Sequence, residues 1–130
     1  MKRGPRRHVL VLDRDDGVRA EIGRLFEDEY EVASFGSTDE AVAALRSDRE
    51  YVLAVCEFDP HDPGAATLVR LVGERTKDGR LRCAMTLTGA LCEEIGECVC
   101  AVLAKPFTRK ALLTALELQP ISGAAATSRR

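Results

Sequence analysis

Short apolar runs alternate along the chain with segments whose apolar residues recur every three or four positions. Four of these runs are nearly continuous and one alternates, and both patterns are typical of β-strands in a sheet. The sequence therefore predicts five strands, at residues 8–12, 30–35, 51–56, 81–87 and 98–104.

The segments between and after these runs predict amphipathic helices, because their apolar residues return to one helix face. Asp15 or Asp16, the capping-box pattern at 37–40 and Thr108 supply three helix N-termini. The inward residues are Val18, Ile22, Leu25 and Phe26; Ala41, Ala44 and Leu45; Leu68, Leu71 and Val72; and Ala111, Leu112, Ala115 and Leu116. Residues 88–97 leave room for a shortened or irregular fourth helix.

Strands that alternate with helices predict an α/β fold with a doubly wound, five-stranded parallel sheet and right-handed crossovers. We expect one domain at residues 8–118. Residues 1–7 form a basic N-terminal tail, and residues 119–130 read as a C-terminal tail or linker.

Composition narrows the class of protein. The chain has 130 residues, 45% of them hydrophobic, and a net charge of -2, which predicts a globular domain without general attraction to nucleic acid or membrane surfaces. The basic N-terminus has no apolar segment of signal-peptide type, and no apolar run approaches transmembrane length. We expect a cytoplasmic protein.

The cysteines agree with that expectation. There are five, an odd number, and Cys56, Cys83, Cys98 and Cys100 lie inside apolar runs. This pattern predicts reduced, buried thiols. Cys92, Cys98 and Cys100 lack the spacing of a zinc site, so we expect no metal there.

Polar residues follow four of the five predicted strands. Asp13 and Arg14 follow the first strand, Glu57 the third, Thr88 the fourth and Lys105 the fifth. The carboxyl ends of parallel strands meet at one edge of a sheet, where ligands bind. A lysine at an apolar strand end also needs a partner. The sequence thus predicts one site at this edge, although Glu57 taken alone reads more readily as a solvated strand end.

Four segments carry a resemblance to a known family. Over residues 8–118 the chain resembles the receiver domain of two-component response regulators, in the segments at 9–19, 51–60, 86–89 and 102–107. The resemblance implies a flavodoxin-like fold of strand order 2-1-3-4-5 and a cis peptide between Lys105 and Pro106. It also implies an aspartate that accepts a phosphoryl group, Mg²⁺ held by two acidic residues after the first strand, and phosphoryl contacts from Thr88 and Lys105.

This sequence departs from that pattern at three positions. Glu57 stands where the family has its phospho-acceptor aspartate, Arg14 replaces one acidic residue of the pair, and Val102 occupies the aromatic switch position. Asp13 and Glu57 then balance Arg14 and Lys105 in charge. We therefore predict a degenerate phospho-acceptor site without catalytic residues, cofactor or Mg²⁺.

The sequence leaves several interpretations open. The favoured one is a pseudo-receiver, not an enzyme, that signals through a protein partner or self-association, on the face of the fourth helix, fifth strand and fifth helix. Alternatively, a histidine kinase still phosphorylates the domain in a phosphorelay, weakly on Glu57 or on Asp59, which would replace the missing ligand. A remote alternative is a haloacid-dehalogenase-like phosphatase with Asp13 as nucleophile. Asp59 and Asp62 otherwise serve the turn, and Arg14 points to solvent or pairs with Glu57 or Asp13.

Overall fold

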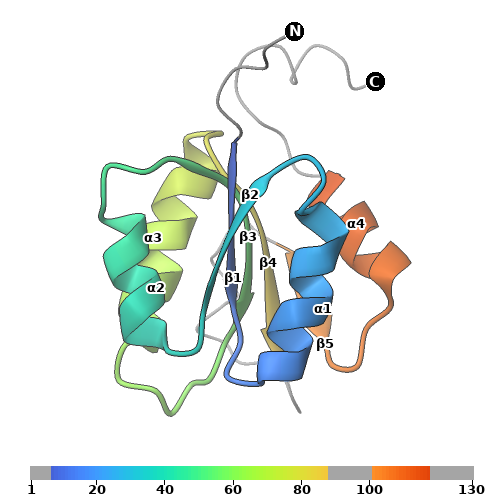
Figure 1. Cartoon of the computed structure of the whole chain (residues 1–130). Helices are drawn as coiled ribbons and strands as arrows, with labels where there is room; N and C mark the ends of the chain where they lie inside the picture. The colour runs from blue at the N-terminus through green and yellow to red at the C-terminus, as the bar shows by residue number, and fades with distance from the viewer. Residues whose placement is uncertain (1–6, 88–100, 118–130) are drawn as a thin grey trace, which may run out of the picture.

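The structure, a computed structural model, describes residues 7–87 and 101–117. Within them, five parallel strands form one sheet in the order β2-β1-β3-β4-β5, which confirms the predicted fold and strand order (Figure 1). The strands are β1 (His8–Leu12), β2 (Glu31–Phe35), β3 (Tyr51–Glu57), β4 (Arg82–Leu87) and β5 (Ala101–Ala104).

Helices cover both faces of the sheet. In Figure 1, α2 and α3 lie on one side of the strands, and α1 and α4 lie on the other. The helices are α1 (Asp16–Phe26), α2 (Thr38–Leu45), α3 (Ala65–Lys77) and α4 (Arg109–Glu117). Three predicted segments lie outside the described residues: the helix at 88–97, residues 1–6 of the N-terminal tail and the C-terminal tail at 119–130.

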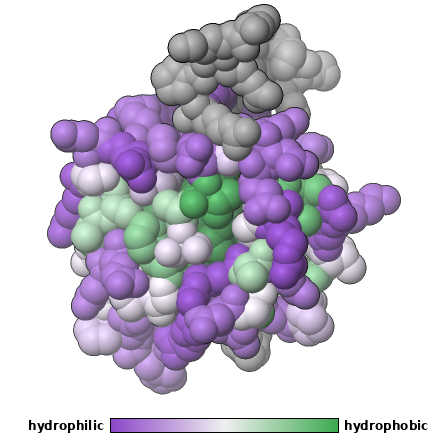
Figure 2. All heavy atoms as spheres, in the orientation of Figure 1, coloured by the Kyte–Doolittle hydropathy of each residue, from purple (hydrophilic) through white to green (hydrophobic). Residues whose placement is uncertain are grey.

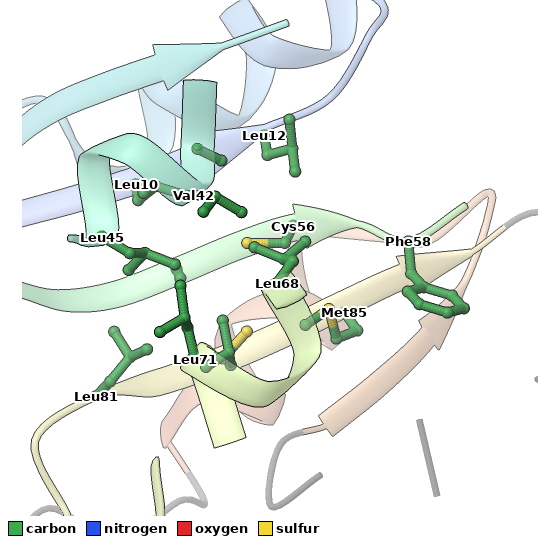
Figure 3. Close-up of a cluster of buried hydrophobic side chains, with 14 of the residues drawn as sticks. Leu10, Leu12, Val42, Leu45, Cys56, Phe58, Leu68, Leu71, Leu81 and Met85 are labelled. Carbon is green, nitrogen blue, oxygen red and sulfur yellow. The ribbon is translucent and has the colours of Figure 1, made fainter. Parts of the chain in front are cut away.

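Strand residues divide between two apolar clusters because successive side chains point to opposite faces of the sheet. Leu10, Cys56 and Met85 pack beneath α2 and α3 (Figure 3). Val9 and Val11 pack on the opposite face against α1 and α4. A sheet buried on both faces explains why its central strands are nearly continuous apolar runs.

Three helix caps match the sequence expectation. Asp15 caps α1 by accepting hydrogen bonds from two main-chain N–H groups, Ser37 caps α2, and the hydroxyl of Thr108 accepts the N–H of Ala111 at 2.9 Å. The caps of α1 and α2 end the loops that follow β1 and β2. These loops are consequently short and lie at the carboxyl edge of the sheet.

The outer surface includes one region that is mainly apolar. Hydrophilic residues surround a band of apolar residues on the face where β2 lies (Figure 2), and Val32, Ala33 and Phe35 of this edge strand are only half-buried. Among the described helices, none has both the length and the apolar character needed to span a bilayer. Cys56 and Cys83 are buried and free of disulfides, as predicted, whereas the other three cysteines lie outside the described residues.

Candidate functional site

Asp13 is the most buried carboxylate at the carboxyl edge of the sheet, with 1% of its surface exposed. It directly follows β1, and its main-chain N–H donates to the carbonyl of Phe35 at the end of β2. Its Oδ1 accepts the N–H of Asp15 at 2.9 Å, and its Oδ2 accepts Lys105 Nζ at 2.8 Å. Both carboxylate oxygens of Asp13 therefore have partners within the chain.

Glu57 ends β3 beside Asp13, and its side chain is 15% exposed. Its Oε1 accepts the main-chain N–H of Arg14 at 3.0 Å, and its Oε2 accepts Lys105 Nζ, also at 3.0 Å. The ammonium group of Lys105 thus bridges two carboxylates on neighbouring strands. Each of the four oxygens of these carboxylates accepts a hydrogen bond from the protein itself.

Lys105 reaches this position because it directly follows β5. Its main-chain N–H donates to the carbonyl of Leu87, which extends the pairing of β5 with β4, and its peptide bond to Pro106 is cis, as the resemblance implies. Burial lowers the pKa of Lys105, but hydrogen bonds from the ammonium to Asp13 and Glu57, together with their charges, raise it by more. The net pKa is raised, so this lysine is held in its charged form.

Arg14 directly follows Asp13 and is mostly exposed, with 59% of its side chain accessible. Its Nη2 lies 2.8 Å from Oδ2 of Asp59, whereas its Nε lies 3.6 Å from Oε1 of Glu57. The pairing with Glu57, one of the alternatives that the sequence left open, is therefore present through a single nitrogen of the guanidinium. The shorter ion pair, with Asp59, was not among the partners that the sequence suggested.

Asp59 also serves the turn after β3, as the sequence suggested. Its Oδ1 accepts the N–H of His61 at 2.9 Å, and Asp62 likewise accepts the N–H of Gly64 at 2.9 Å. The hydrogen bond from His61 is the main reason why the pKa of Asp59 is lowered; partial burial opposes it, and the hydrogen bond and charge of Arg14 lower it further. Asp59 is thereby kept ionised beside the guanidinium.

Asp59 changes the predicted charge balance. Asp13 and Glu57 offset Arg14 and Lys105, as the sequence indicated, but Asp59 adds one negative charge to the cluster. The loop direction after β3 decides this contact. No residue spacing in the sequence reveals that direction, so the ion pair could not be read from the sequence.

Of two further predicted site positions, the structure describes Val102 but not Thr88. Val102 is half-buried in β5, aligns with Met85 of β4 and packs against the cluster beneath α2 and α3. Its role as a switch position stays a prediction. Thr88 lies outside the described residues, so its place in the site also stays a prediction.

A cavity of about 330 Å³ opens beside Glu57. Its lining comes from the ends of β1 and β3, the turn between β2 and α2, and the loop before α3: Leu12, Arg14, Gly36, Ser37, Thr38, Glu57 and Asp62. The site therefore lies at the point where the strand order reverses, between β1 and β3, as expected for a doubly wound sheet.

Comparisons with known proteins identify the fold. No protein-family model matches the chain, and no curated protein matches it. Among solved structures, a response regulator receiver protein from Sinorhizobium medicae is similar with a TM-score of 0.71 and 21% identity, covering 85% of this chain and 91% of that one. The chemotaxis protein CheY4 of Vibrio cholerae has a TM-score of 0.67 and 19% identity, covering 88% and 98%.

A third neighbour is a response regulator protein from Burkholderia pseudomallei, with a phosphorylated aspartic acid and a calcium ion. Its TM-score is 0.66 at 18% identity, covering 85% of this chain and 66% of that one. At these identities the similarity shows the fold, and the fold is that of response regulator receiver domains.

The divalent cation that this fold implies does not fit the residues present. Asp13 and Glu57 already accept hydrogen bonds at every carboxylate oxygen, and the guanidinium of Arg14 lies against Glu57. Within residues 7–87 and 101–117, no group of three or more His, Cys, Asp or Glu side chains is arranged to hold a metal ion. A cation at these oxygens would compete with the ammonium group of Lys105 and be repelled by the guanidinium of Arg14.

Proposed function

We propose that this domain is a pseudo-receiver, a signalling module that acts by protein–protein contact and not as an enzyme. In this proposal the usual cycle of Mg²⁺-dependent aspartate phosphorylation is absent. One observation carries the proposal: Asp13 and Glu57, at the positions of a metal ligand and the phospho-acceptor, are both hydrogen-bonded to Lys105 and to main-chain N–H groups.

The chemistry of phosphoryl transfer supports this reading. The reaction depends on a metal ion that positions and neutralises the phosphoryl oxygens. Mg²⁺ requires octahedral oxygen geometry and sheds its water reluctantly, so a site with the guanidinium of Arg14 in place of a carboxylate offers it little. Glu57 is one methylene longer than aspartate, and a displacement of about 1 Å can cost roughly 10²-fold in rate.

The phosphatase alternative has less support. Its nucleophile would be Asp13, which is 1% exposed, and both of its carboxylate oxygens already accept hydrogen bonds. The next acidic residue of that motif, Asp15, accepts hydrogen bonds from Gly17 and Val18 and caps α1. A capping carboxylate is poorly available as an acid or base for a substrate.

We further propose where the domain acts and through which face. The buried thiol of Cys56, which forms no disulfide, suits the reducing environment of the cytoplasm. The partner surface is the face of the predicted fourth helix, fifth strand and fifth helix. The structure describes its β5 and α4, the latter being the predicted fifth helix, where Ala104, Arg109 and Lys110 are exposed. The output then passes through a protein partner or a second copy of the domain.

Mass spectrometry of the intact protein after incubation with acetyl phosphate and Mg²⁺ tests the proposal. We expect no mass increase by a phosphoryl group, while an aspartate-bearing receiver treated in parallel becomes phosphorylated. A phosphorylated product from the unmodified chain would contradict the proposal. Peptide mapping would then separate Glu57 from Asp59, and so identify the acceptor of a still functional receiver.

A further inference from the structure

Arg19 is a second arginine at this site, and no pattern in the sequence indicates its role. It lies in the second turn of α1, yet only 20% of its side chain is exposed. Its Nη1 donates to the main-chain oxygen of Asp13 at 2.5 Å, and its Nη2 pairs with Asp16. The guanidinium therefore joins the first turns of α1 to the end of β1.

One peptide group connects Arg19 to Glu57. The carbonyl of Asp13 and the N–H of Arg14 belong to the same planar unit and point in opposite directions when the peptide is trans. Arg19 donates to the oxygen of this peptide unit, and the N–H of the same unit, which belongs to Arg14, donates to Oε1 of Glu57 at 3.0 Å. A donor on the oxygen fixes the plane and polarises the N–H, which strengthens its hydrogen bond.

Gly36 makes room for this guanidinium. A Cβ at Gly36 would lie 2.9 Å from Nη1 of Arg19, closer than a non-bonded carbon tolerates. Among the described residues, only Gly79 has a positive φ, so the backbone of Gly36 suits alanine. A side chain at position 36 would therefore clash mainly with Arg19.

We propose that Arg19 is the positioning residue of the site, which orients the Asp13–Arg14 peptide so that its N–H satisfies Glu57, in a space that Gly36 leaves open. The inference deepens the proposed function, because it names what keeps Glu57 hydrogen-bonded within the chain. It concerns a main-chain hydrogen bond that exists without phosphate or metal. It can therefore fail while the proposed function stands, and the reverse also holds.

Hydrogen exchange of the Arg14 amide, followed by NMR without Mg²⁺ or phosphate, tests the proposal. Loss of one ordinary hydrogen bond corresponds to about fivefold faster local exchange, and we expect at least that acceleration in Arg19→Ala. The amide of Val55 in β3 monitors global unfolding. Arg24→Ala, which removes an exposed arginine from the same helix, serves as the matched control and should leave the Arg14 amide unchanged.

Gly36→Ala provides a second route that does not remove Arg19. By displacing the guanidinium, it should also accelerate exchange at Arg14, whereas adding it to Arg19→Ala should change nothing further, because the two substitutions act on one contact. Unchanged exchange at Arg14 relative to Val55 in both single variants would overturn the proposal. Additive effects in the double variant would overturn the role assigned to Gly36.

Discussion

The ammonium group of Lys105 joins two strand ends, with Nζ 2.8 Å from Oδ2 of Asp13 and 3.0 Å from Oε2 of Glu57. The three side chains are 21%, 1% and 15% exposed, so most of this ion network is withdrawn from water. Removing one partner of a buried ion pair costs more than the pair contributes, because it leaves an uncompensated charge.

Lys105→Met should therefore destabilise the domain strongly. We expect a loss of about 3–5 kcal/mol in the free energy of unfolding, measured by urea denaturation, because Asp13 and Glu57 would remain close together without their shared cation. Lys110→Met, on the exposed surface of α4, is the matched control and should stay within about 0.5 kcal/mol of the parent. Equal stability of the two variants would show that Lys105 is not the central contact.

The raised pKa of Lys105 gives its contribution to stability a defined pH window. The pKa is higher in the folded protein than the ordinary value of 10.5. The folded state therefore holds this proton more tightly than the unfolded state does. The contribution is complete below the unfolded pKa and is lost as pH rises through the folded pKa.

Urea denaturation between pH 9 and roughly pH 12 measures this effect, because the upper limit passes the ordinary lysine pKa of 10.5. Other groups titrate in the same range, so the quantity of interest is the difference between the parent and Lys105→Met. We expect this difference to be constant near pH 9 and to shrink as the medium becomes more alkaline. A difference that grows with pH would contradict the raised pKa.

Arg14→Ala should have a small effect on stability. The guanidinium is 59% exposed, and an exposed ion pair is worth about 0–1 kcal/mol. The hydrogen bond from residue 14 to Glu57 comes from the main-chain N–H, so it survives this substitution. We expect a loss below about 1 kcal/mol, which falls further at high salt because exposed charges are screened. A loss near the 3–5 kcal/mol typical of a broken buried pair would mean that Arg14 is far less exposed in solution.

The fold was predictable from the sequence because its determinants are local. The apolar run at residues 8–12 coincides with β1, and Asp15, Ser37 and Thr108 cap helices at the predicted positions. The parallel arrangement then follows, because strands that alternate with helices have few other ways to bury both faces.

The site was predictable only where strand ends define it. Asp13, Glu57 and Lys105 directly follow or end strands, so the sheet brings them together. The ion pair of Arg14 with Asp59 and the contact of Arg19 with the Asp13 carbonyl depend on loop direction and on the reach of long side chains. The spacing of residues in the sequence determines neither the direction of a loop nor the position that a long side chain reaches. In addition, a charged residue beside an apolar helix face is ordinarily interpreted as solvated.

Two substitutions together should create the Mg²⁺ site that the proposed function holds to be absent. Glu57→Asp alone shortens the acceptor but leaves the guanidinium of Arg14 beside it, so we expect no gain of Mg²⁺ binding. Arg14→Asp together with Glu57→Asp supplies three carboxylates around Lys105, with Asp13, and removes the competing cation. With a third carboxylate as an oxygen ligand and no guanidinium beside it, this double variant should bind Mg²⁺.

Calorimetric titration with Mg²⁺ tests the central claim most directly, namely that a site with Arg14 and Glu57 at these two positions does not bind the metal. We predict no binding heat for the unmodified protein at millimolar Mg²⁺, and saturable binding for the variant that carries both Arg14→Asp and Glu57→Asp. Its melting temperature should also rise with Mg²⁺, since a ligand at 100 times its Kd stabilises by about 2.7 kcal/mol. Saturable binding of Mg²⁺ to the unmodified protein would contradict the account.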